Sequence, residues 1–200
     1  LALCPTIGFV HGKSHPDLEE ADLRILFTPG SYMEGKVYVL DDHPGMTCGA
    51  AQPRPESSGY VRAVSRDPSD APRVQPNYLA AEADQRITLA GLRLVRALFN
   101  SKELAPYFEC ETLPGPDVTS EDELLDFARR RGNTGYHLVG TCRMGPDTDA
   151  TAVVDDTLRV HGVTGLRVVD ASIMPMLPSA NTFASTIAIA EKAADMIRTP

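Results

Sequence analysis

The sequence predicts an α+β fold, in which an antiparallel sheet is covered on one side by helices and is followed by a C-terminal strand and helix. Three observations lead to this prediction. β-rich runs in the first third of the chain are separated by turn residues and not by helical patterns. A long amphipathic pattern and a capping signal follow. The last third then places a β-branched run before an alanine-rich helix.

The strands are predicted from residue alternation. Residues 22–27 (DLRILF) alternate apolar and polar side chains, as a half-buried strand does. Residues 36–40 and 59–65 are two further β-rich runs. We expect residues 1–16 to form a loop, and we expect no regular element to occupy all of the polar, proline-rich residues 41–58.

The helices are predicted from their period and their end signals. Apolar side chains recur every three or four residues over 79–100, which predicts an amphipathic helix. Ser120 and Glu123 have the spacing of a capping box, so a second helix should begin there and end near Gly132. Residues 166–169 (LRVV) are predicted as a buried strand. A last helix should open around Asn181 and Thr182, beyond two prolines.

Composition excludes several classes of protein. The chain has 200 residues, 42% of them hydrophobic, which is enough for a globular core. Its net charge is −8, so a basic surface for nucleic acid is not expected. No apolar run reaches the roughly 20 residues that a membrane-spanning helix needs. A nucleic-acid partner is therefore not predicted, and a membrane association is not favoured.

The four cysteines are Cys4, Cys48, Cys110 and Cys142. They contain no C-x-x-C pair, and their wide spacing matches neither a zinc ligand set nor a dense disulfide framework. We therefore predict no metal site, reduced thiols and a cytoplasmic protein.

Three polar elements could carry chemistry. His137 lies in a glycine-rich segment between a helix and a strand, and histidine is a common general base near neutral pH. Asp170 follows the predicted strand, at the end where open α/β sheets place ligands. Asn181 opens a helix whose first N–H groups have no partner within the helix. Taken singly, each also has a plain structural explanation: a packed histidine, a turn cap and a helix cap.

Together these elements resemble the C-terminal part of the glucose–methanol–choline (GMC) oxidoreductases, and most closely their choline-dehydrogenase-like branch. The resemblance rests on His137 followed by V-G-T-C-R-M-G, on the S-A-N-T element at 179–182, and on I-A-E-K-A-A-D at 189–195. A weaker match is the D-P…P…N-Y-L passage between Asp67 and Leu79. Residues 1–58 match only loosely.

The resemblance implies an FAD-dependent oxidoreductase that oxidises a primary alcohol to an aldehyde by hydride transfer to flavin N5. His137 would accept the alcohol proton, and Asn181 would be its partner across the site. The resemblance also implies FAD contacts from Asp170 and Ala171 and from the helix end formed by Asn181, Thr182 and Phe183. Residues 1–135 would then be a substrate-binding domain, and residues 136–200 would carry the active-site segment and return to the FAD-binding domain.

The sequence departs from the family in one respect. It contains no G-x-G, the motif with which dinucleotide-binding flavoproteins cradle the pyrophosphate. We therefore expect the N-terminal FAD-binding region to be a missing partner of this chain, and the isolated 200 residues to retain little FAD and to be inactive. Two alternatives stay open: a flavin-containing lyase of the oxynitrilase type, and a catalytically silent binding module on the same scaffold.

Overall fold

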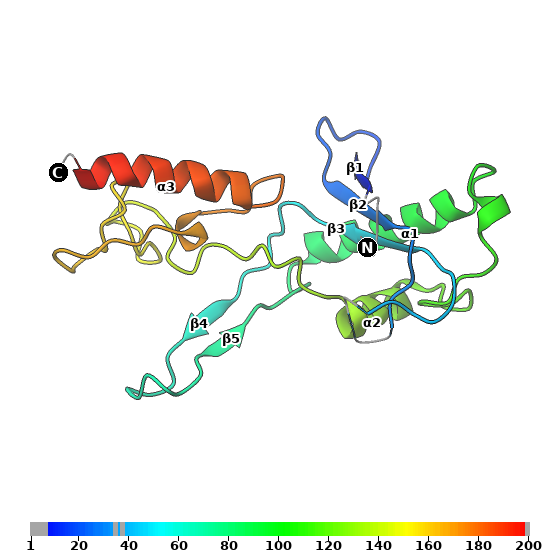
Figure 1. Ribbon diagram of the computed structural model, residues 1–200, viewed down its shortest axis with the longest axis horizontal. Coiled ribbons are helices and arrows are strands. Elements are labelled where there is room, and N and C mark those ends of the chain that lie inside the picture. Colours follow the sequence, from blue (N-terminus) through cyan, green and yellow to red (C-terminus); the bar gives the residue numbers. More distant parts are fainter. Residues whose placement is uncertain (1–7, 34–35, 37–38, 199–200) are drawn as a thin grey trace. The chain divides into compact units, whose positions relative to one another are not determined.

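The structure, a computed structural model, describes residues 8–33, 36 and 39–198 (Figure 1). They form two compact units. The first comprises Glu56–Ser58, Asn77–Asn133 and the described residues up to Gln52. The second comprises Pro53–Pro55, Gly59–Pro76 and the described residues from Thr134 onward. The fold is α+β with antiparallel sheets, as predicted.

The first unit is built on a three-stranded antiparallel sheet of order β1-β2-β3, formed by β1 (Gly8–Gly12), β2 (Leu23–Thr28) and β3 (Thr47–Ala51) (Figure 1). Leu23 and Ile25 on β2 are buried, so the alternation that predicted this strand does turn one face toward the core. The strand predicted at 22–27 is confirmed within one residue.

Two strands of this sheet were not predicted. β1 lies within residues 1–16, which we expected to form a loop, and β3 lies within the proline-rich segment 41–58. β3 has the sequence TCGAA, without the large alternating side chains that reveal a strand. Its small residues suit a close approach, because a Cβ added at Gly91 of the covering helix would lie 2.5 Å from the Ala50 Cβ. The predicted strand 36–40 lies partly outside the described residues, and Leu40 forms an isolated bridge with Tyr32.

Two helices complete the first unit. α1 (Glu82–Phe99) lies against β2 and β3 and buries Leu89 and Val95, and α2 (Glu121–Arg131) packs against α1. α1 begins three residues later than predicted, because Asn77 and Leu79 have left-handed φ angles of 56° and 58°. The capping box predicted at the start of α2 is confirmed.

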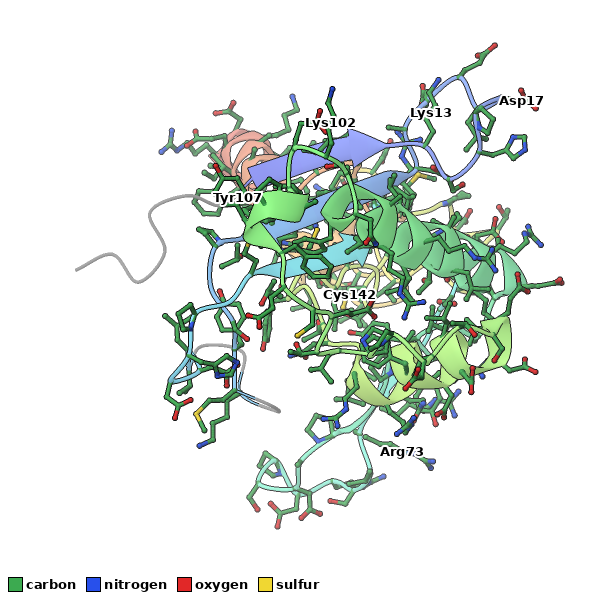
Figure 2. The ribbon with its side chains drawn as sticks, turned by 90° about the vertical axis from the view of Figure 1, so that its right-hand side faces the viewer. Lys13, Asp17, Arg73, Lys102, Tyr107 and Cys142 are labelled. Atoms are coloured by element: carbon green, nitrogen blue, oxygen red, sulfur yellow. The ribbon has the colours of Figure 1, made fainter. Side chains whose placement is uncertain are left out.

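Short loops extend from these elements. Lys13 and Asp17 lie on the loop between β1 and β2, and Tyr107 lies in the 3₁₀ helix η1 (Ala105–Tyr107), which follows α1 (Figure 2).

The second unit contains a separate β-hairpin of β4 (Tyr60–Arg62) and β5 (Arg73–Gln75). The guanidinium groups of Arg62 and Arg73 lie 4.5 and 6.0 Å from the centre of the Tyr60 ring. The prediction that residues 59–65 belong to the same sheet as residues 22–27 is therefore wrong. Turn residues at both ends identify a strand, but they do not identify its pairing partner.

The core of the second unit joins distant parts of the chain. Val154, Leu158 and Ile173 pack with Ala193 of α3 (Phe183–Arg198). The prediction of a buried strand at 166–169 is wrong. Within those residues the structure has only an isolated bridge, from Arg167 to Arg159. The turn before residue 166 brings only a short segment alongside, so no longer ladder forms.

α3 is apolar on two sides. Ala193 is buried, and Ile189 and Met196 pack on the core with it. Phe183 and Ile187, one turn apart at the start of the helix, are exposed in this chain.

Candidate functional site

His137 lies in a short turn at the start of the second unit. The preceding residue, Tyr136, has a left-handed φ of 59°, which is uncommon for a residue with a side chain. Its backbone N–H donates to the Thr134 hydroxyl at 3.0 Å. The turn leaves the His137 side chain half-buried. Backbone conformations of this kind cost free energy and are often found at functional sites.

The segment after His137 is hydrogen-bonded to the segment that leads to Asn181. The Cys142 N–H donates to the Ser172 carbonyl at 3.0 Å, and the Met144 N–H donates to the Ile173 carbonyl at 2.8 Å. Gly140 permits this pairing, since its φ is 85° and a Cβ there would lie 3.5 Å from the Met174 carbonyl oxygen. The structure thus brings the segments that carry the two predicted catalytic residues together in one unit.

The side chain of Arg143 also holds this segment in place, through contacts with Asp149 and Thr151. Its guanidinium lies 3.0 Å from the Asp149 carboxylate and donates to the Thr151 hydroxyl at 2.6 Å. Hydrogen bonds from the Thr151 hydroxyl and backbone, together with the Arg143 charge, hold the pKa of Asp149 below its usual value. Cys142, which is labelled in Figure 2, and Arg143 are therefore held by hydrogen bonds, and His137 lies five residues before Cys142 in the chain.

Asp170 and Ala171 lie directly before this pairing. Asp170 is the N-cap of the 3₁₀ helix η2 (Ala171–Ile173), and its carboxylate accepts a hydrogen bond from the Ser172 N–H at 2.7 Å. The capping role that a lone aspartate suggested is therefore present. Asp170 is also exposed, so the rest of its carboxylate faces outward.

Asn181 and Thr182 lie directly before α3, which begins at Phe183. The Thr182 carbonyl accepts from the Thr186 N–H at 2.9 Å and from the Thr186 hydroxyl at 2.8 Å, and Thr182 itself is buried. Asn181 is exposed, and Phe183 is 76% exposed. Thr182 is therefore held by hydrogen bonds at the start of the helix, and Asn181 immediately precedes Thr182.

The Ser-Ala-Asn-Thr element also contacts a residue that the sequence analysis did not single out. The Arg54 Nε donates to the Ser179 hydroxyl at 2.7 Å, although the two residues are 125 positions apart. No local period or spacing predicts such a contact. The one sequence signal was the pair of prolines on either side of Arg54.

These residues suit one end of FAD and not the other. The first N–H groups of a helix carry partial positive charge, which suits the pyrimidine edge of a flavin. The start of α3 offers such groups beside exposed side chains. The ADP half needs a glycine-rich loop, and the sequence contains no G-x-G. Within the described residues, no group of three or more His, Cys, Asp or Glu side chains could hold a metal ion. Of the helices described, none is long and apolar enough to span a membrane.

Comparison with known proteins identifies the family. The family model for GMC oxidoreductases matches residues 55–190. The chain belongs to the GMC oxidoreductase family. The chain is 42% identical over 190 residues to an alcohol dehydrogenase [acceptor] of Pseudomonas putida, and this match covers 95% of the chain and 34% of the relative. It is 40% identical over 194 residues to the mitochondrial choline dehydrogenase of Homo sapiens, which covers 96% of the chain and 32% of that relative.

A solved structure agrees with this assignment. The pyridoxine 4-oxidase from Mesorbium loti matches with a TM-score of 0.84 and 29% identity, over 96% of this chain and 38% of that one. The predicted resemblance to the choline-dehydrogenase-like GMC oxidoreductases is confirmed, and members of this family are FAD flavoproteins. The chain spans about a third of the length of the curated relatives that it matches.

Proposed function

We propose that the full-length protein is an FAD-dependent oxidoreductase that oxidises a primary alcohol to an aldehyde. The observation that carries this proposal is the backbone pairing of the His137 segment with the segment leading to Asn181, through Cys142 and Met144. The pairing brings a candidate base and a candidate amide into one unit of a GMC oxidoreductase. Relatives named as alcohol and choline dehydrogenases support a hydroxyl group as the site of oxidation.

The proposed chemistry separates a hydride from a proton. When bound, FAD supplies the hydride acceptor, at its N5. His137 accepts the hydroxyl proton on a ring nitrogen as the carbinol C–H bond breaks, so that the C–O bond becomes a carbonyl without a full negative charge on oxygen. The Asn181 amide donates a hydrogen bond to the same oxygen and orients it. Asparagine does not titrate near neutral pH, so a single ionising base carries the reaction.

We propose that the flavin end of FAD contacts two places in the second unit. The first place is the start of η2, formed by Asp170 and Ala171. Asn181, Thr182 and Phe183 present the N–H groups at the start of α3 to its pyrimidine edge, where negative charge gathers on reduction. Support comes from the exposure of Asp170, Asn181 and Phe183 in an otherwise hydrogen-bonded region.

The remaining partner in this proposal is the N-terminal FAD-binding region. It supplies the pyrophosphate loop that the present sequence does not contain. The exposed apolar side chains of Phe183 and Ile187 on α3 support packing against that region. Residues 1–135 then serve mainly to bind substrate, and residues 136–200 carry the reacting groups.

The test uses full-length protein purified with its flavin. Adding a primary alcohol without oxygen should bleach the flavin absorbance. Rapid mixing at saturating alcohol isolates the reduction step, and His137→Ala should slow it by roughly 10²–10⁴-fold with unchanged FAD content.

A flavin that stays oxidised with every alcohol tested while the protein cleaves a cyanohydrin would identify a lyase. A protein that purifies without flavin would identify a silent binding module. Reduction at the wild-type rate by His137→Ala would remove His137 from the mechanism.

A further inference from the structure

Arg54 and Ser179 form a contact between two parts of the chain that are distant in sequence. The Arg54 Nε donates to the Ser179 Oγ at 2.7 Å, and both residues belong to the second unit. A guanidinium is charged at all working pH values, so this donor is always available. A charged donor also makes a stronger hydrogen bond than a neutral one, but Arg54 is exposed, so water competes for this contact and its net contribution is small.

The segment that carries Arg54 is stiff. Pro53 and Pro55 flank it, and Pro53 is buried. A proline fixes its own φ, and it also restricts the residue before it to extended conformations. Arg54 is therefore presented from a backbone with few alternatives. This lowers the backbone conformational entropy lost when the contact with Ser179 forms.

Ser179 lies two residues before Asn181, in the loop between Pro178 and α3. At the far side of Asn181, the Thr182 carbonyl is held by the Thr186 N–H and hydroxyl. Asn181 is thus flanked by two anchors: the Arg54 contact before it and the first turn of α3 after it. Of these two, only the Arg54 contact comes from outside the local sequence.

We propose that Arg54 is a positioning residue for Asn181. It acts through Ser179, by holding the Ser-Ala-Asn-Thr loop in the conformation in which the Asn181 amide meets the alcohol oxygen. This inference rests on the role proposed above for Asn181. A loop displaced by a fraction of an ångström leaves the amide out of line with the reacting oxygen, which slows the chemical step.

The test is a mutant cycle in the full-length, FAD-loaded enzyme. Arg54→Ala and Ser179→Ala should each slow flavin reduction roughly 3- to 10-fold, as expected for the loss of one orienting hydrogen bond. The double variant should be no slower than either single one. In an Asn181→Ala background, Arg54→Ala should have almost no further effect. Arg54→Lys should recover part of the rate, because its ammonium can still reach the Ser179 hydroxyl.

Two measurements separate positioning from general damage. FAD content and melting temperature should stay at wild-type values in Arg54→Ala. Arg66→Ala removes an exposed arginine of the same unit and should reduce flavin at the wild-type rate. If Arg54→Ala folds poorly, Ser179→Ala removes the same contact without altering the Pro-Arg-Pro segment.

The outcomes are distinct. A wild-type rate in both Arg54→Ala and Ser179→Ala, with a slow Asn181→Ala, would overturn this inference and leave the proposed function in place. An equal loss from Arg54→Ala with and without Asn181 would also overturn it, since Arg54 would then act by another route. A wild-type rate in Asn181→Ala would overturn both this inference and the role proposed for the amide.

Discussion

Asp84 holds Ser57 by a 2.8 Å hydrogen bond from the Ser57 backbone N–H to its carboxylate. The same carboxylate accepts from the Glu56 N–H at 2.9 Å, and the Asp84 residue is only 2% exposed. The Ser57 hydroxyl in turn accepts from the Ala81 N–H at 3.0 Å, just before α1. One buried side chain thus satisfies two backbone donors of a loop that has no regular structure of its own.

Replacing Asp84 should therefore destabilise the first unit. In Asp84→Asn the amide keeps one acceptor oxygen but turns an NH₂ group toward a backbone donor. We expect the free energy of unfolding of the full-length protein to fall by about 1–3 kcal/mol, the cost of one buried unpaired donor. Urea unfolding followed by circular dichroism measures this. Asp117→Asn, at an exposed position, is the matched control and should change stability by less than about 0.5 kcal/mol.

The same carboxylate predicts a pH dependence. Burial raises the pKa of Asp84, but the hydrogen bonds from Ser57, Glu56 and Gln52 together outweigh burial and hold the pKa below its usual value. A carboxylate with a lowered folded-state pKa stabilises the protein above its unfolded pKa of about 3.9. This contribution is lost as the pH falls through the folded-state value. The stability difference between wild type and Asp84→Asn should be constant above about pH 5 and should shrink below about pH 4. A difference that grows on acidification would contradict the assignment.

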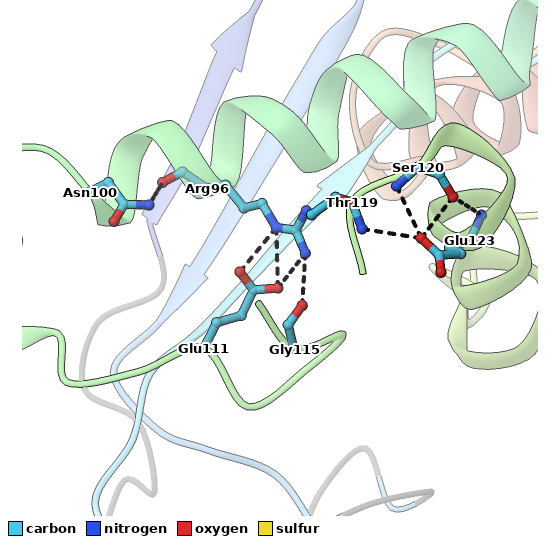
Figure 3. Close-up of polar contacts among 7 residues, drawn as sticks. All are labelled: Arg96, Asn100, Glu111, Gly115, Thr119, Ser120 and Glu123. Atoms are coloured by element: carbon cyan, nitrogen blue, oxygen red, sulfur yellow. Dashed lines mark hydrogen bonds and ion pairs between the residues drawn. The ribbon is translucent and has the colours of Figure 1, made fainter. Parts of the chain in front are cut away.

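Arg96 of α1 fixes the loop between η1 and α2. Its Nε and Nη2 both contact the Glu111 carboxylate, and Nη2 also donates to the Gly115 carbonyl at 3.0 Å (Figure 3). The two side chains are 24% and 19% exposed. A double-mutant cycle of Arg96→Ala and Glu111→Ala should give a coupling energy of about 1–2 kcal/mol.

A second ion pair, between Arg93 of α1 and Glu121 of α2, provides the control for this cycle. Arg93 contacts Glu121 through one nitrogen at 2.7 Å, and these side chains are 55% and 64% exposed. Water competes for such a pair, so its coupling energy should stay below about 1 kcal/mol. Equal coupling energies in the two pairs would show that the bidentate, half-buried geometry of the Arg96–Glu111 pair does not strengthen it.

Flavin retention is expected to depend on residues outside this chain. Purified residues 1–200 should contain little FAD. The groups that suit the flavin edge are present, but the sequence has no pyrophosphate loop to hold the rest of the cofactor. The absorbance ratio at 450 and 280 nm of the purified chain, compared with that of full-length protein, measures this. A yellow chain with one flavin per molecule would contradict this prediction, because residues 1–200 would then bind the cofactor by themselves.

Sequence reasoning succeeded where one local rule decided the structure. Alternation at Leu23 and Ile25 predicted β2, and the reciprocal cap of Ser120 and Glu123 predicted the start of α2. It failed where pairing partners decided. β3 consists of small residues because α1 lies close to it, and residues 166–169 read as a strand although their neighbour offers a single bridge.

The candidate site was predicted from short motifs. They led to His137 and Asn181, whose roles stay predictions. Arg54 could not be found in this way, since its contact with Ser179 joins positions 125 residues apart. The backbone pairing of Cys142 with Ser172 was also invisible, because main-chain hydrogen bonds place no demand on side-chain identity.

The interleaving of the two units has a consequence for protein synthesis. The second unit takes Pro53–Pro55 and Gly59–Pro76 from early in the chain, and its core residues Val154 and Ala193 come from late in the chain. The β4–β5 hairpin therefore leaves the ribosome well before the core that it belongs with has been translated. All residues of the first unit lie at or before Asn133, so this unit can fold before the rest of the second unit has been translated. No single cut in the chain separates the two units, so gene fusions or homologue chimeras joined at one point between residues 59 and 133 would combine mismatched halves of the second unit.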